Sequence, residues 1–394
     1  MNLVSLLAIV VFISWVYWLL ALWATRSFFS GKQKASSEFT PPVSILKPLR
    51  GLDHQIYYNL RSFCTQDYPR FEILFGVQSL EEPSVPIVQQ LSQEFPAIPI
   101  KIVVAEPRGA NRKVGLLEAL ASRAQYPILV ISDSDIRVPP DYLRRVIAPL
   151  ADPETGLVTC LYRGQELDSL AAKVEALYIS ANFLPSAIIG FHWLRMSYAF
   201  GSTIVIGKEE LEEIGGFGAI ANHLADDYEI GARVKAIGRK VLFSDCIVET
   251  VLGPVRWGEL WHRQLRWMRC SWVSRPREYP GIVLTLSIPL SLVVALLTGF
   301  SFLGKLLLLT SIAVRFITGW IILGYMGHRQ LRRSLPLLPI ADLFHGILWA
   351  VAPLGKRIVW RDEEYILQRD GRLIPVKNPG FRTLIPFFRS HKGK

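Results

Sequence analysis

The stretch Ile128–Asp135, ILVISDSD, joins a short apolar run to two carboxylates and decides the fold. A short apolar run without alternation is typical of a strand buried on both faces of a sheet. The runs Val43–Leu46, Phe71–Val77 and Ile100–Val104 have the same character, and helical patterns separate them. This alternation predicts an α/β domain over residues 40–275, with a mainly parallel sheet and helices on both faces.

Two carboxylates, Asp133 and Asp135, directly follow the predicted strand Ile128–Ser132. Ligands of such sheets bind beyond the carboxyl ends of the strands. Paired carboxylates in a tight turn suit Mg²⁺ or Mn²⁺ that is shared with substrate phosphates, and such an ion neutralises charge on a departing diphosphate. A DxD sequence is also common in ordinary turns, so a purely structural role stays open.

A second acidic pair, Asp226 and Asp227, stands where Ile230 and Val234 indicate the start of a helix. An aspartate in the first turn of a helix satisfies free backbone N–H groups, and this explains one of the two. Two adjacent aspartates exceed what a cap needs. One of them could act as a general base towards a hydroxyl.

A third candidate is the segment Arg263–Trp267, RQLRW, in a tryptophan-rich stretch just before a long apolar block. Tryptophan at that position is typical of the membrane interface. Arg263 and Arg266 are one helical turn apart and share a face. They could bind phosphate oxygens or anionic lipid headgroups, and the pattern alone favours neither.

The chain has 394 residues, of which 51% are apolar, and a formal net charge of +11. A positive balance suits an anionic lipid or an anionic small molecule. Nucleic acid is disfavoured, because no basic run with interleaved aromatics lies outside the membrane-flanking regions. The cysteines are far apart and lack CxxC spacing, which indicates reduced thiols of a cytosol-facing domain without a zinc site.

The N-terminal segment, Leu3–Trp23, is long and apolar enough to cross a bilayer, and we interpret residues 1–25 as a retained anchor. Basic residues follow it, so its carboxyl end is expected in the cytoplasm. Two more spans are predicted, Ile282–Leu303 and Leu306–Tyr325, within a membrane region at residues 280–355.

A third apolar segment of that region, Leu335–Leu354, contains prolines and ionisable residues, and we interpret it as re-entrant or interfacial. The tail at residues 356–394 has ten Lys and Arg against four Asp and Glu. It is therefore predicted to be a basic cytoplasmic tail. The chain as a whole is expected to be a multi-pass integral membrane protein with a cytoplasmic catalytic domain.

The order of these motifs resembles that of inverting glycosyltransferases with the GT-A fold. More closely, it resembles the ceramide glucosyltransferases and their bacterial relatives, including hopanoid-associated glycosyltransferases. The matching segments are Val43–Gly51, Asn59–Phe63, Gln66–Pro69, Asn111–Lys113, Ile131–Val138, Gly215–Phe217, Asp226–Tyr228 and Arg263–Trp267. The resemblance implies a GT-A domain, with a Rossmann-like mixed sheet, beside helical transmembrane segments.

The resemblance also implies roles for single residues. Asp133 and Asp135 match the motif that binds the metal ion and the nucleotide diphosphate. Asp227 matches the aspartate regarded as the catalytic base, and Lys113 matches a lysine near the nucleotide.

The remaining implied roles concern the substrate. Arg263, Arg266 and Trp267 match the (Q/R)xxRW motif, which holds the diphosphate and borders the acceptor site. Ser79 stands where the family usually has an aspartate that touches uridine, and Glu81 or Glu82 could substitute for that aspartate. The resemblance therefore does not imply the usual recognition of the base. Gly201, in a small-residue turn, is interpreted as lining the donor pocket.

The expected function is inverting transfer of a hexose, with glucose favoured, from a UDP-sugar to a lipid hydroxyl. Ceramide, diacylglycerol and a hopanoid-type lipid all stay open as acceptors, as does the oligomeric state. One alternative is a processive polysaccharide synthase, which shares the motifs but needs more spans for a channel. The other is a catalytically silent membrane scaffold, favoured by Ser79 in the aspartate position.

Overall fold

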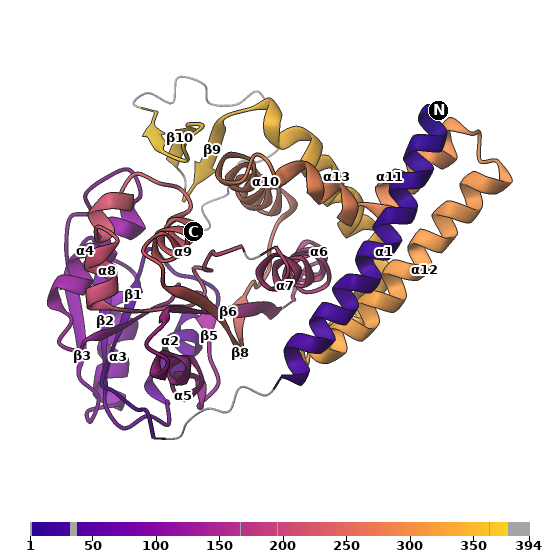
Figure 1. Ribbon diagram of the computed structural model, residues 1–394. Helices are drawn as coiled ribbons and strands as arrows, with labels where there is room; N and C mark the ends of the chain where they lie inside the picture. The colour runs from indigo at the N-terminus through magenta and orange to yellow at the C-terminus, as the bar shows by residue number, and fades with distance from the viewer. Residues whose placement is uncertain (1, 32–37, 166, 195, 362, 377–394) are drawn as a thin grey trace.

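The computed structural model describes residues 2–31, 38–165, 167–194, 196–361 and 363–376 (Figure 1). One eight-stranded sheet organises the chain, with strand order β3-β2-β1-β4-β7-β6-β8-β5. Its strands are β1 Val43–Pro48, β2 Phe71–Val77, β3 Ile100–Val104, β4 Ile128–Ile131, β5 Ile136–Arg137, β6 Thr155–Gln165, β7 Ile204–Gly207 and β8 Lys240–Val251. The first four strands are parallel, β7 is antiparallel to both neighbours, and β6 pairs with β8 in parallel. The predicted mixed, mainly parallel sheet is confirmed.

Helices cover both faces of this sheet. They are α2 Ile56–Cys64, α3 Val85–Glu94, α4 Arg112–Arg123, α5 Tyr142–Ile147, α6 Leu170–Tyr178, α7 Leu184–His192, α8 Lys208–Glu213, α9 Asp226–Ala236 and α10 Trp257–Ser274. Adjacent strand residues pack on opposite faces, because successive side chains of a strand alternate. Ile45 lies in the core under α2, α3 and α5, whereas Leu46 lies in the core under α4, α8 and α9. This double burial explains the uninterrupted apolar runs.

Two long helices, α1 Leu3–Ser30 and α12 Phe302–Tyr325, run side by side at one end of the molecule (Figure 1). At about 1.5 Å per residue both exceed the roughly 30 Å of a hydrocarbon core. Within the described residues, four helical stretches are long and apolar enough to cross a membrane: α1, α12, residues 170–192 and residues 330–354. Most of the 170–192 stretch is buried inside the protein, so burial explains its apolar composition.

The segment predicted as one span over Ile282–Leu303 is not one continuous helix. A 3₁₀ helix at Tyr279–Thr285 and α11 at Ser287–Leu297 meet at an angle of 75°. Pro289 explains the break, because a proline is tolerated only in the first turn of a helix. By contrast, α12 matches the predicted span Leu306–Tyr325 and extends it by one turn.

The apolar segment near residue 340 forms α13, Leu338–Val351, with 3₁₀ turns before and after it. Arg315 of α12 forms a bidentate ion pair with Asp342 of α13, at 2.7 and 2.9 Å, and both side chains are buried. The Arg315 guanidinium also lies 3.5 Å from the ring centre of Trp18 on α1 and donates to the Ala181 carbonyl. This contact set ties three helices of the apolar bundle together.

The same bundle is attached to the α6–α7 stretch. Tyr17 of α1 donates a hydrogen bond of 2.7 Å to Ser186 of α7, and the rings of Trp23 and Trp193 lie 5.2 Å apart. The α6 end of the stretch packs against α13. The α/β domain is thereby fixed against the apolar helices at both ends of this stretch.

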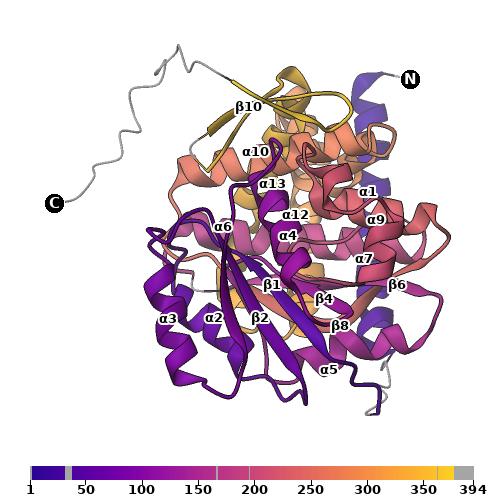
Figure 2. The same ribbon diagram turned by 90° about the vertical axis from the view of Figure 1, so that its left-hand side faces the viewer.

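The region after the apolar helices was predicted to be a basic tail, but its first part is a small antiparallel sheet. Its strands are β9 Arg357–Trp360, β10 Glu363–Leu367 and β11 Leu373–Pro375. It lies above α4 and α10, against the α/β domain (Figure 2). Residues 377–394 of the predicted tail lie outside the described residues.

Candidate active site

The DxD turn lies at the carboxyl end of β4, between β4 and β5. A buried lysine at the end of β1, Lys47, donates a hydrogen bond of 2.6 Å to the Asp133 carbonyl and lies over the ring of Phe63. Burial lowers the pKa of Lys47 to about 7, against the opposing effect of Asp133 and Asp135. Lys47 therefore fixes the backbone of the turn, and the Asp133 carboxylate remains available for other partners.

Lys113, in the first turn of α4, joins the two acidic motifs. Its ammonium lies 2.8 Å from Asp133 and 3.0 Å from Asp226. Burial alone would lower the pKa of Lys113, but the two ion pairs raise it above its ordinary value. The lysine is therefore a fixed cation between two carboxylates that lie 93 positions apart in the sequence.

Gly201 lies between Asp133 and the predicted base. Its N–H donates to the Asp227 carboxylate at 3.1 Å, and its carbonyl accepts from the Asp133 N–H at 3.3 Å. A Cβ at this position would lie 2.8 Å from an Asp133 oxygen. Gly201 therefore contacts both Asp227 and Asp133, and Lys113 joins them through its ion pair with Asp133.

The Asp227 side chain is half-buried at the start of α9. Burial, and then the neighbouring Asp226, raise the pKa of Asp227 to about 6. Two backbone N–H groups, of Gly201 and Tyr228, donate to it and hold its orientation. A carboxylate with a raised pKa is typical of a catalytic base.

Asp135 lies against a further carboxylate that the sequence analysis missed. Its side chain accepts a hydrogen bond of 3.0 Å from Thr250 of β8. Burial, and then Asp53 and Asp133, raise the pKa of Asp135 to about 6. Asp53 also accepts a short hydrogen bond from Ser134, in the middle of the DxD turn.

The three residues predicted on α10 have different surroundings. Arg263 forms a bidentate ion pair with the buried Glu175 of α6, to which Gln264 also donates. Arg266 lies over the ring of Trp360, at 5.1 Å. Trp267 packs on the aromatic cluster between α7 and the sheet.

Ser79 lies in the turn after β2, and its hydroxyl accepts from the Glu81 N–H at 3.1 Å. The proposed substitute Glu82 accepts from the Gly51 N–H at 3.0 Å. The adjacent Gln78 accepts from Arg112, at the start of α4. These contacts hold the β2 turn beside the β1 turn.

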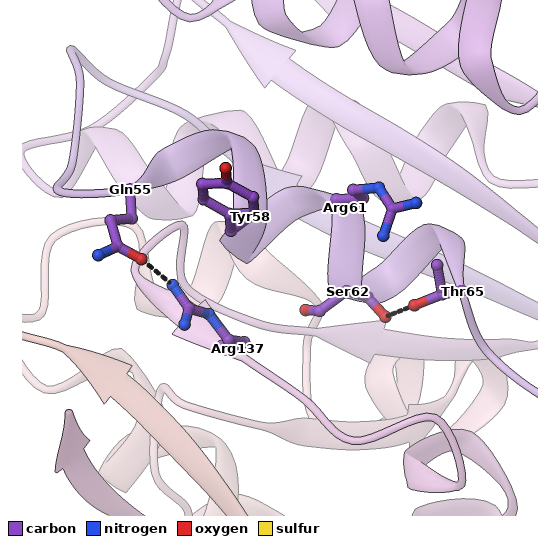
Figure 3. Close-up of a pocket in the computed structure, with 6 residues that line it drawn as sticks. All are labelled: Gln55, Tyr58, Arg61, Ser62, Thr65 and Arg137. Carbon is purple, nitrogen blue, oxygen red and sulfur yellow. Dashed lines mark hydrogen bonds between the residues drawn. The ribbon is translucent and has the colours of Figure 1, made fainter. Parts of the chain in front are cut away.

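A hollow of about 330 Å³ on the described surface lies elsewhere (Figure 3). Its lining residues are Gln55, Tyr58, Arg61, Ser62, Thr65 and Arg137. Its two basic side chains already have partners, because Arg61 pairs with Glu94 and Arg137 bonds to Gln55. None of the predicted site residues lines this hollow, and we do not assign the active site to it.

Four residues in or next to the site were not identified from the sequence: Lys47, Asp53, Glu175, and Arg361, whose guanidinium lies 3.3 Å from Asp53. Lys47 lies near the end of β1, and Asp53 follows this strand. The rule that ligands bind beyond the carboxyl ends of strands applies to β1 as it does to β4. Glu175 and Arg361 carry no such local signal. They are positioned by contacts between segments distant in sequence.

The DxD turn offers two carboxylates, of Asp133 and Asp135, to a divalent ion. No cluster of three metal-ligating side chains is present in the described part of the chain. Mg²⁺ commonly binds through one or two carboxylates and completes its shell with water and substrate phosphates. Burial and the repulsion from two neighbouring carboxylates raise the pKa of Asp135. A bound cation would relieve this repulsion. The donor set fits a divalent ion that is shared with a phosphorylated substrate.

Comparisons with solved structures place the fold. The mannosyltransferase PcManGT from Pyrobaculum calidifontis, solved with GDP-Man and Mn²⁺, is 18% identical and matches with a TM-score of 0.54. The match covers 89% of this chain and 99% of that one. The expected GT-A fold is confirmed.

Comparisons of sequence extend over most of the chain. Ceramide glucosyltransferase 1 and ceramide glucosyltransferase 3 of Caenorhabditis elegans are each 25% identical, over 86% and 96% of this chain and 74% and 84% of their own. Beta-monoglucosyldiacylglycerol synthase of Synechocystis is 24% identical over 64% of this chain and 55% of its own length. The model of glycosyl transferase family 21 matches residues 6–373. The chain therefore belongs to glycosyl transferase family 21 and is a sugar-transferring enzyme.

Proposed function

We propose that this enzyme transfers a hexose, with glucose favoured, from a UDP-sugar to the hydroxyl of a membrane lipid, with inversion. One observation carries the proposal: Gly201 bonds to Asp227 on one side and to Asp133 on the other. The carboxylate suited to prime an acceptor thus lies one residue away from the carboxylate suited to the donor diphosphate. The names of the relatives, which include ceramide and diacylglycerol, support a lipid acceptor.

In this proposal Asp227 accepts the proton of the acceptor hydroxyl. The hydroxyl oxygen attacks the anomeric carbon while the bond from that carbon to the diphosphate oxygen breaks on the opposite side. An α-linked donor then yields a β-glycoside. A pKa of about 6 suits this step, because a base works best when its pKa lies near the working pH.

The diphosphate leaves towards the DxD turn. A divalent ion bound there by Asp133 and Asp135 would neutralise part of the charge on the departing UDP. Lys113 holds the Asp133 carboxylate in place and adds a fixed positive charge. We expect EDTA to abolish transfer and added Mn²⁺ or Mg²⁺ to restore it.

The direct test of the base is Asp227→Asn. The amide keeps the size of the side chain and an oxygen for the Gly201 N–H, so the variant should fold and bind UDP. Transfer should fall by about 10³-fold or more, since a positioned base contributes about 10²–10⁴-fold. Near-normal turnover by this variant would remove Asp227 from the base role.

Donor and acceptor are tested together. Membranes that contain the protein are incubated with labelled UDP-glucose, UDP-galactose and UDP-N-acetylglucosamine, and the glycolipid formed is identified by mass. We expect a single sugar on a lipid with glucose preferred. A long polymer would instead indicate a polysaccharide synthase.

We also propose that the catalytic domain faces the cytoplasm in a multi-pass protein. The apolar helices α1 and α12 support the spans, and the basic residues that flank them support the orientation. Protease treatment of sealed, right-side-out cells should leave the catalytic domain intact. Its digestion under those conditions would reverse the orientation.

A further inference from the structure

The small C-terminal sheet contacts three segments that carry predicted site residues: the start of α4, the loop before α9, and α10. Its core packs on Leu224, just before the acidic pair of α9, and on Cys270 of α10. The backbone of its β10–β11 turn bonds to the same loop, with 3.0 Å from the Leu224 N–H to the Gly371 carbonyl and 2.7 Å from the Leu373 N–H to the Asn222 carbonyl. The sheet therefore packs against the catalytic domain, on the loop before α9 and on α10.

Ion pairs hold the other side of this sheet. Glu363, the first residue of β10, lies 3.1 Å from Arg50 and 3.0 Å from Arg112. Arg50 follows β1 and Arg112 begins α4, so the sheet bridges the two loops that flank the DxD turn. The hairpin between β9 and β10 therefore has a fixed position above those loops.

Arg361 lies at the end of this hairpin. Its backbone is left-handed, with φ of +50°, a conformation that non-glycine residues seldom adopt. Its guanidinium donates to the Arg50 carbonyl at 3.0 Å and lies 3.3 Å from the Asp53 carboxylate. Asp53 in turn bonds to Ser134 of the DxD turn. One carboxylate therefore separates Arg361 from the DxD turn.

Arg266 approaches the same place from α10. It lies over Trp360, the residue before Arg361. Among the described residues no carboxylate lies within ion-pair distance of Arg266. Burial, with smaller contributions from the charges of Arg263 and Arg361, lowers the pKa of Arg266 to about 10. Through Trp360 and Asp53, the guanidinium groups of Arg266 and Arg361 are both placed near the DxD turn.

We infer that Arg361 is a donor-binding residue, which contacts the diphosphate of the nucleotide sugar from the side opposite the DxD turn, together with Arg266. This inference rests on the proposed function of the site. The diphosphate is the part of the donor that matches two guanidinium groups, since each can donate two parallel hydrogen bonds to phosphate oxygens. The C-terminal sheet is then part of the donor site, although it follows the apolar helices in the sequence.

The test compares three variants by binding of UDP and uridine in the presence of Mn²⁺. Arg361→Gln removes the proposed contact, and Arg369→Gln removes the same charge from an exposed position of the same sheet. Glu363→Gln weakens the ion pairs that hold the sheet but retains Arg361. Thermal unfolding in detergent shows whether each variant is folded.

We expect Arg361→Gln to weaken UDP binding about tenfold or more and to leave uridine binding within about twofold, since a hydrogen bond to a charged group contributes about 1.5–3 kcal/mol. It should raise KM for the donor and leave KM for the acceptor unchanged. Arg369→Gln should bind UDP as the unaltered protein does, and Glu363→Gln should weaken it less than Arg361→Gln.

Equal binding of UDP by folded Arg361→Gln and the unaltered protein would overturn the inference. So would an equal loss in Arg361→Gln and Glu363→Gln, because Arg361 would then act only by holding the sheet. An unaltered protein that bound no UDP would refute the proposed donor instead, whatever the variants did. If Arg361→Gln does not fold, Arg361→Lys repeats the comparison with the charge retained. A lysine cannot donate two parallel hydrogen bonds to phosphate oxygens, so normal UDP binding and a normal donor KM in this variant would overturn the assigned contact.

Discussion

The sharpest test of the site is Gly201→Ala. A Cβ at this position would lie 2.8 Å from an Asp133 oxygen and 3.1 Å from the Lys113 ammonium. Ordinary van der Waals contact begins near 3.4 Å, so the carboxylate must move by about 0.6 Å. Asp133 has a short side chain and is held at two points. Its backbone N–H donates to the Gly201 carbonyl, and its carboxylate pairs with Lys113. The shift therefore displaces the donor side of the site.

A misplacement of about 1 Å can reduce catalysis about 10²-fold, so we expect kcat/KM to fall about 10- to 100-fold, or about 1.4–2.7 kcal/mol of transition-state stabilisation. The assay is transfer from labelled UDP-glucose in membranes at several Mn²⁺ concentrations. Gly218→Ala is the matched control, because the nearest atom to its Cβ would lie 3.5 Å away, at Glu118. Unchanged kcat/KM and Mn²⁺ dependence in Gly201→Ala would refute the assignment of one shared site.

Three further outcomes are expected. Transfer should be maximal above pH 6 and fall about tenfold per pH unit below it, because Asp227, whose raised pKa is about 6, acts only when deprotonated; a flat profile between pH 4.5 and 7 would argue against this base. Asp342→Asn should lower the free energy of unfolding by about 3–5 kcal/mol, since it leaves the buried Arg315 without its charged partner. The double variant Arg315→Met with Asp342→Leu should regain most of this stability in thermal unfolding. Glu175→Gln should lower the unfolding temperature through Arg263 and leave UDP binding nearly unchanged, and a large loss of UDP affinity would instead connect Arg263 directly to the donor.

The sequence predicted those parts of the fold that local pattern determines. Phe71–Val77 and Ile100–Val104 have the predicted bounds. Phe71–Val77 is buried along its whole length, whereas Ile100–Val104 is an edge strand and is only half-buried. The rule that ligands bind beyond strand ends led to Asp133 and Asp135, and the helix beginning at Asp226 followed from its apolar spacing. The roles of these residues remain predictions.

Patterns failed where long-range contacts decide. The run from Ile282 is apolar but bends ahead of Pro289. Arg361 looks like any basic tail residue in the sequence, and its nearness to Asp53 depends on how β9 and β10 pack on α10 and the preceding loops.

The attachment of the α6–α7 stretch to α1, through Tyr17 and Ser186 and through the ring contact of Trp23 with Trp193, has a consequence for acceptor choice. This attachment fixes the height of Asp227, meaning its position along the axes of the apolar helices. An acceptor whose hydroxyl protrudes to that height meets the base with no further movement of the protein. In a lipid with the same reactive alcohol on a longer spacer, the hydroxyl should lie beyond Asp227. Selection among acceptors would then depend on headgroup length as much as on chemical identity.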